Sequence, residues 1–161
     1  MAPAITILFV MNIFPLLWSF GLSFFNYRAS SLKVPTFRGL SNYERVLTDD
    51  KVWERFQTTA IIVGSSVILQ LIVGFLLALL FAKAFPMRRI VLMLVLTPMM
   101  LSFVSVGVFF KLFYEPTFGI VSYLLNFLSE ERFVMLGSST GAIAGIVIAD
   151  AWMWSPFVML L

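Results

Sequence analysis

Residues 56–82 read FQTTAIIVGSSVILQLIVGFLLALLFA and contain no charged side chain. A helix needs about 20 mostly apolar residues to cross the hydrocarbon core of a bilayer, and this stretch is longer than that. Its apolar residues follow one another without the alternation of a barrel strand. Because backbone groups in lipid must satisfy their own hydrogen bonds, the stretch predicts a transmembrane helix.

Three further stretches have the same character. Residues 1–27 and 90–110 carry no charge, and residues 133–161 carry only Asp150. We therefore expect an all-α integral membrane fold in a single domain over residues 1–161, with four transmembrane helices plus short interfacial helices. The expected spans are about 3–25, 57–82, 90–112 and 142–161, and the connections between them are 26–56, 83–89 and 113–141.

The composition excludes several functional classes. Hydrophobic residues make up 61% of the 161 residues and charged residues 12%, against about 45–50% and about 25% in soluble domains. The chain has no cysteine and no histidine, which removes thiolate nucleophiles, histidine bases and Cys/His zinc sites. We expect no catalytic and no metal-binding residue. The net charge of +3 points to a membrane surface rather than to nucleic acid.

The connections carry most of the charge. The turn at 83–89 holds Lys83, Arg88 and Arg89, which predicts a cytoplasmic location. The first connection also holds cations, so charge alone leaves the orientation open; they are Arg28, Lys33, Arg38, Arg45, Lys51 and Arg55.

Short helices are predicted within two of these connections. Ser41 and Glu44 have the spacing of a capping box, which predicts the start of a helix. That helix could lie at the membrane interface with Trp53 as an aromatic anchor, or it could cover the bundle. Residues 120–128 are apolar but too few to span, which predicts a short interfacial or re-entrant helix.

Asp150 is the one acidic residue within an expected span. Charges inside a membrane are costly and mark functional sites by default. Trp154 and Phe157 follow at helical spacing, so this face could offer a carboxylate and aromatic rings to a polyol. Alternatively, Asp150 could pair with a cation or backbone group of a neighbouring helix or subunit. Gln70 could bind a ligand or, more commonly, make an interhelical hydrogen bond.

Small residues and prolines also occur within the spans. Gly141, Gly145 and Ala149 recur at intervals of four, which predicts close helix packing. Pro15, Pro98 and Pro156 each lie in a span; such breaks suit a moving transporter, although membrane helices carry extra proline in any case.

Several segments, in this order, resemble binding-protein-dependent ABC transporter permeases of the carbohydrate-uptake group, the maltose and glycerol-3-phosphate type. The resemblance covers about residues 14–161. Its segments are Phe37–Tyr43 with Val52, Trp53 and Phe56–Thr59, Gly74–Leu80, Arg88 and Arg89 with Leu96–Pro98, Phe110–Gly119, and Ala149–Phe157. The sequence departs from the family pattern at Thr58, Ser102 and Phe110.

The resemblance implies the N-terminal portion of a six-helix importer permease in the plasma (inner) membrane of a prokaryote. It places 26–56 and 113–141 outside and 83–89 inside, and it places the loop that contacts the ATPase beyond Leu161. Implied partners are a second permease subunit, cytoplasmic ATP-binding subunits, an extracytoplasmic solute-binding protein and membrane lipid. ATP and Mg²⁺ would bind the partner ATPase, and this chain would hold no cofactor.

On this basis we expect a non-enzymatic subunit that moves sugars or related polyols by alternating access. Candidate substrate-path residues are Asp150, Trp154, Phe157 and Gln70. Candidate contacts with the binding protein are Arg38, Asn42, Tyr43 and Tyr114. The alternatives are a secondary transporter or channel subunit, a membrane-embedded enzyme and a structural membrane scaffold; of these, ion coupling and lipid chemistry would need more charged groups than the spans contain.

Overall fold

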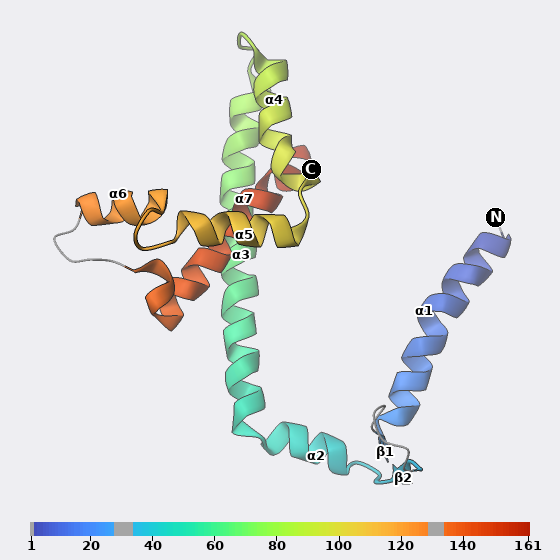
Figure 1. Ribbon diagram of the computed structural model, residues 1–161. Helices are drawn as coiled ribbons and strands as arrows, with labels where there is room; N and C mark the ends of the chain where they lie inside the picture. The colour runs from blue at the N-terminus through green and yellow to red at the C-terminus, as the bar shows by residue number, and fades with distance from the viewer. Residues whose placement is uncertain (1, 28–33, 129–133) are drawn as a thin grey trace. The chain divides into compact units, whose positions relative to one another are not determined.

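A computed structural model describes residues 2–27, 34–128 and 134–161, and Arg28, Lys33 and the 129–133 segment lie outside the described residues. The chain divides into two compact units, Met1–Gln57 and Thr58–Leu161 (Figure 1). The expectation of a single domain stays a prediction. The larger elements are α1 (Ala2–Leu22), α2 (Ser41–Thr48), α3 (Asp50–Ala82), α4 (Arg88–Leu96), α5 (Phe103–Phe113), α6 (Ile120–Leu128) and α7 (Ser139–Leu160).

The first unit contains α1, a short strand pair and α2. Strand β1 (Phe25–Asn26) pairs antiparallel with β2 (Thr36–Phe37), with Phe25 opposite Phe37. α1 covers most of the expected first span, but its apolar part at 6–22 is shorter than the spanning helices α3 and α7. Pro15 lies within α1 without ending the helix. The indole nitrogen of Trp53 donates to the carbonyl of Leu47 at 2.8 Å, across the junction between α2 and α3.

Within the described residues, two helices, α3 and α7, are long and apolar enough to cross a membrane by themselves. α3 contains the expected span 57–82 and begins earlier, at Asp50, so that the end of the expected first connection is helical. α7 contains the expected span 142–161 almost entirely, and Pro156 lies within the helix. The prediction of spanning helices in these two regions is therefore confirmed.

The expected third span over 90–112 is not one continuous helix. α4 is followed by a 3₁₀ turn, η1 (Thr97–Met100), and α5 then leaves at 104°. Pro98 lacks the amide hydrogen that an α-helix needs, and it occupies the start of the 3₁₀ turn. Leu101 and Ser102 are extended, and Ser102 accepts a hydrogen bond from the amide of Ser105 and so caps α5. The pair α4–α5 is either a broken span or a re-entrant loop.

The second unit has its core where α5 and α7 meet. α5, α6 and a second 3₁₀ turn, η2 (Met135–Gly137), all contact this region. The buried core residues are Val106, Phe110, Tyr114, Met135 and Met153. α4 runs back beside the second half of α3 (Figure 1). The short helix expected at 120–128 is confirmed.

Most of the large apolar side chains in the spanning helices are exposed. In α3 only Ser66, Gly74 and Phe81 are buried, whereas Phe75 remains 63% exposed. Exposed apolar surface of this extent needs lipid or further helices to cover it. The burial pattern therefore agrees with a membrane-embedded helix bundle.

Candidate functional site

A hydrogen bond joins the two spanning helices near their middles. The Gln70 amide on α3 donates through Nε2 to Oδ2 of Asp150 on α7 at 2.7 Å, and both side chains are half-buried. The intramembrane carboxylate is thus paired with a neutral amide of a neighbouring helix. This is the interhelical contact that the sequence favoured for Gln70, and it gives Asp150 a side-chain amide as a partner on the neighbouring helix.

The same face of α3 continues one helical turn to either side of Gln70. A Cβ added to Gly74 would lie 2.6 Å from Val158 Cβ and 2.9 Å from the Ser155 carbonyl oxygen, so α3 and α7 touch closely there. Ser66 is 4% exposed, and its hydroxyl has no hydrogen-bond partner among the described residues. The helix contact is therefore tight at Gly74 and polar at Gln70.

Aromatic rings stand on the face of α7 that carries Asp150. Trp154 and Phe157 follow Asp150 by one and two turns, and their ring centroids lie 6.3 Å apart at 90°. Trp154 is half-buried and Phe157 is 46% exposed. The ring of Phe103, at the start of α5, lies 6.1 Å from that of Trp154. Sequence reasoning missed Phe103, because only the break before α5 brings it to α7.

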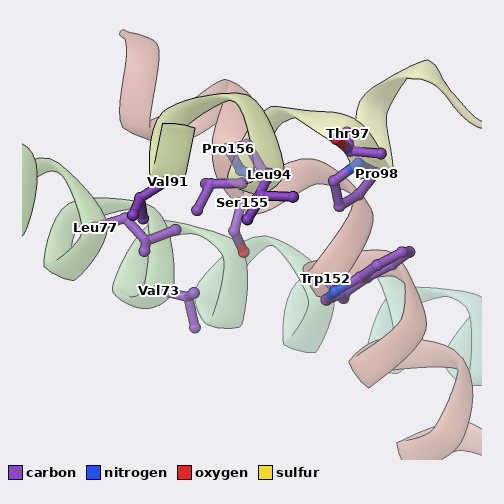
Figure 2. A pocket seen from close by; sticks show the side chains of 10 residues that line it. Val73, Leu77, Val91, Leu94, Thr97, Pro98, Trp152, Ser155 and Pro156 are labelled. Atoms are coloured by element: carbon purple, nitrogen blue, oxygen red, sulfur yellow. The ribbon is translucent and has the colours of Figure 1, made fainter. Parts of the chain in front are cut away.

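An apolar cavity of about 420 Å³ lies among α3, the α4–η1 segment and α7 (Figure 2). Its lining residues are Val73, Leu77, Val91, Leu94, Val95, Thr97, Pro98, Trp152, Ser155 and Pro156. The hydroxyls of Thr97 and Ser155 donate to carbonyls of their own helical segments, at Met93 and Ala151. The cavity thus suits apolar groups, and the face of α7 with Asp150 and Trp154 suits a polyol better.

Tyr114 is placed inside the second unit. It is 3% exposed, and its hydroxyl donates to the Gly145 carbonyl at 3.0 Å. Ser122 Oγ in turn donates to the Tyr114 carbonyl at 3.1 Å. Because its side chain presents so little surface, we do not retain Tyr114 among the proposed contacts with a binding protein.

The glycine spacing in α7 marks close packing, as predicted. A Cβ at Gly145 would lie 3.0 Å from the Tyr114 ring, and one at Gly141 would lie 2.1 Å from the Met135 carbonyl oxygen. Both glycines are buried. These positions are therefore structural.

In the first unit, Asn42 and Tyr43 form hydrogen bonds to Ser23 and Phe25, and we call this set of contacts the clasp. Asn42 Nδ2 donates to the carbonyls of Ser23 at 2.8 Å and Phe25 at 3.0 Å, and the Tyr43 hydroxyl shares a hydrogen bond of 2.5 Å with Ser23 Oγ. Gly39 has a φ of +56°, which glycine adopts without strain. These contacts tie the end of α1 and β1 to the start of α2.

A helix begins at Ser41 as predicted, but the predicted capping box is wrong. The residue before the helix is Leu40, and it makes no side-chain cap hydrogen bond. Ser41 lies inside the first turn, because the positive φ of Gly39 and the bonds of Asn42 fix the chain direction there. Of the residues proposed to contact a binding protein, Arg38 is exposed, Asn42 is half-buried and Tyr43 is 37% exposed.

No protein-family model matches the chain. It is 35% identical over 163 residues to a probable ABC transporter permease protein of Sinorhizobium fredii, covering 99% of this chain and 52% of that protein. It is 29% identical over 159 residues to a trehalose/maltose transport system permease protein of Thermococcus litoralis, covering 99% and 54%. The chain thus spans about half the length of these relatives.

A solved structure shares the fold. A bacterial ABC transporter that imports the acidic polysaccharide alginate matches with a TM-score of 0.77 at 18% identity, covering 98% of this chain and 52% of that one. At this identity the match shows the fold alone. The resemblance stated from the sequence is confirmed by the curated relatives, which are ABC transporter permeases.

Proposed function

We propose that this chain, which is related along its whole length to ABC transporter permeases, forms part of the permease subunit of an ATP-driven importer of sugars or related polyols. The observation that carries the proposal is the 35% identity to a permease across 99% of the chain. The curated relatives include permeases named for trehalose/maltose and for sulfoquinovosyl glycerol transport. Saccharides and their glycerol conjugates are therefore the favoured substrate class.

The proposed substrate path follows the face of α7 that carries Asp150, Trp154 and Phe157. A carboxylate accepts hydrogen bonds from hydroxyl groups, and the aromatic rings offer an apolar surface to the C–H face of a sugar. Gln70 holds the carboxylate in place through its amide at 2.7 Å. No bond of the substrate would change, so the subunit would not act as an enzyme.

Transport would proceed by alternating access between two packings of the helices. The partners we propose are a second permease subunit, two cytoplasmic ATP-binding subunits that hold ATP and Mg²⁺, an extracytoplasmic solute-binding protein and membrane lipid. The chain would be multi-pass in a prokaryotic plasma (inner) membrane, with Arg38 outside and the turn at 83–89 inside. An exposed Arg38 suits an acidic surface on a binding protein.

Energy coupling distinguishes this proposal from its main rival, a secondary transporter. Labelled disaccharides are added outside cells whose only copy of the permease carries this sequence. Their uptake is measured after ATP depletion and, separately, after an uncoupler has removed the proton gradient. We expect uptake to stop on ATP depletion and to survive an uncoupler. Uptake that stops with the uncoupler while ATP persists would favour ion coupling at Asp150, and no uptake of any sugar would favour a scaffold.

A further inference from the structure

Phe103 occupies an unusual place in the second unit. It is the first residue of α5 and follows the extended pair Leu101–Ser102. Its ring is tilted by 38° against Trp154 on α7, with the centroids 6.1 Å apart, yet the residue remains 67% exposed. Phe103 therefore contacts the Trp154 ring and leaves most of its own surface free for a ligand.

The other aromatic residues of α5 contact Trp152 or one another instead. Phe110 is 9% exposed and contacts Trp152 at 5.4 Å. Phe109 also stacks on Trp152, at 6.2 Å. Trp152 lies on the side of α7 opposite Asp150, because two residues turn a helix by about 200°. Within the described part of the chain, Phe103 is thus the α5 aromatic residue that contacts Trp154, on the proposed path.

The helix break explains how Phe103 reaches this position. A straight helix through 90–112 would carry residue 103 along the direction of α4. Instead, the chain turns by 104° after η1, and the cap from Ser102 to the amide of Ser105 starts α5 in a new direction. The break therefore sets the direction of α5 and also places Phe103 beside Trp154.

We propose that Phe103 is a specificity-determining residue that extends the Trp154 ring into a wider platform for a saccharide. The sugar would lay its C–H face on the rings of Phe103 and Trp154, while its hydroxyls reach Asp150 one turn away on α7. The wider platform favours a substrate of two or more sugar rings over a single one. This inference rests on the proposed function.

The test uses the assembled transporter with its binding protein and ATPase in proteoliposomes. Uptake of labelled glucose, maltose, trehalose and maltotriose is measured beside ATP hydrolysis for the unmodified protein and for Phe103→Ala, Phe103→Trp and Trp154→Ala. Phe75→Ala is the matched control, because Phe75 on α3 is 63% exposed and contacts no aromatic ring among the described residues.

We expect Phe103→Ala to lower sugar transported per ATP by about tenfold, equivalent to about 1.4 kcal/mol. The loss should be larger for di- and trisaccharides than for glucose, Phe103→Trp should restore uptake, and Phe75→Ala should have no effect. A structural role alone would lower the amount of assembled complex and would leave the sugar-to-ATP ratio unchanged.

Three outcomes would overturn the inference, and they separate it from the proposed function. If Trp154→Ala impairs uptake and Phe103→Ala does not, the Phe103 platform is wrong while the path along α7 stands. If neither variant changes uptake, both the platform and the path are wrong. If the unmodified transporter takes up none of the sugars while it hydrolyses ATP, the proposed saccharide substrate class is wrong, and the inference that depends on it is wrong too.

Discussion

At the scale of single residues, the bond between Gln70 and Asp150 gives a carboxylate within an expected membrane span a hydrogen-bond donor. The amide supplies this donor at 2.7 Å from a neighbouring helix. The sequence indicated Asp150 by its charge and Gln70 by its depth, but it could not pair them. They lie 80 residues apart, and such pairings depend on tertiary packing.

Substitutions at this pair should separate hydrogen bonding from charge. Asp150→Asn keeps an acceptor for Gln70, so we expect unchanged thermal stability of the intact permease in detergent together with altered transport. Asp150→Leu removes the acceptor and should cost about 0.6–1.7 kcal/mol. A double-mutant cycle with Gln70→Leu should return a coupling energy of similar size. Equal losses for Asp150→Asn and Asp150→Leu would show that charge, rather than the hydrogen bond, stabilises the fold.

Two glycines of the same helix provide a test of close packing. Gly74→Ala adds a methyl group 2.6 Å from Val158 Cβ, whereas Gly64→Ala meets nothing within 4 Å. We expect Gly74→Ala to destabilise the bundle by about 1–3 kcal/mol. Gly64→Ala should be neutral or slightly stabilising, because alanine favours helix. Thermal unfolding of both variants in detergent measures the difference, and equal unfolding temperatures would contradict the contact between α3 and α7.

At the scale of elements, the three prolines within expected spans have different effects. Pro15 and Pro156 lie inside continuous helices, whereas Pro98 coincides with the 104° bend. The difference lies in the residues that follow. After Pro98 the chain enters the extended pair Leu101–Ser102, and Ser102 can begin a new helix by capping it. The presence of proline alone therefore predicted a kink at each site and could not identify Pro98 as the site of the bend.

Removal of the Ser102 cap should destabilise the first turn of α5. Ser102→Ala deletes the acceptor for the Ser105 amide and should cost about 1 kcal/mol. Ser102→Asp keeps an acceptor and should retain most of that stability. Hydrogen exchange at residues 103–106 in the purified permease would report the change. Equal protection in the alanine and aspartate variants would contradict the capping role.

The clasp in the first unit makes a second prediction at this scale. Asn42→Ala removes two hydrogen bonds to the Ser23 and Phe25 carbonyls, worth about 1 kcal/mol each. Asn42→Asp places an acceptor against two other acceptors and should be worse. Hydrogen exchange should rise in residues 23–26 and 36–43 for both variants.

Arg38→Ala is the control for the clasp. Its side chain is exposed, and its backbone bond to Phe24 survives the substitution, so exchange should stay unchanged. Stimulation of transport by the binding protein should nevertheless fall, if Arg38 contacts that partner. Unchanged exchange in Asn42→Ala would show that the clasp does not hold this segment.

At the scale of the whole molecule, the sequence predicted the parts better than their connections. Long uncharged stretches report burial in lipid directly, so α3 and α7 were found from composition alone. The glycine spacing in α7 also reported close packing. In contrast, the burial of Tyr114 under Gly145, the position of Phe103 beside Trp154 and the clasp of Asn42 depend on contacts between residues distant in sequence, which no local pattern carries.

The central claim is that the Asp150 face of α7 lines a substrate path. Because the chain has no cysteine, single cysteines can be placed at Asp150, Trp154 and Phe157, with Ile148 on the opposite face of α7 as control. In the assembled transporter, a charged, membrane-impermeant thiol reagent should modify the first three positions, and a transported sugar should slow that reaction. Equal reactivity at Ile148, or no reaction at any of the three, would contradict the account.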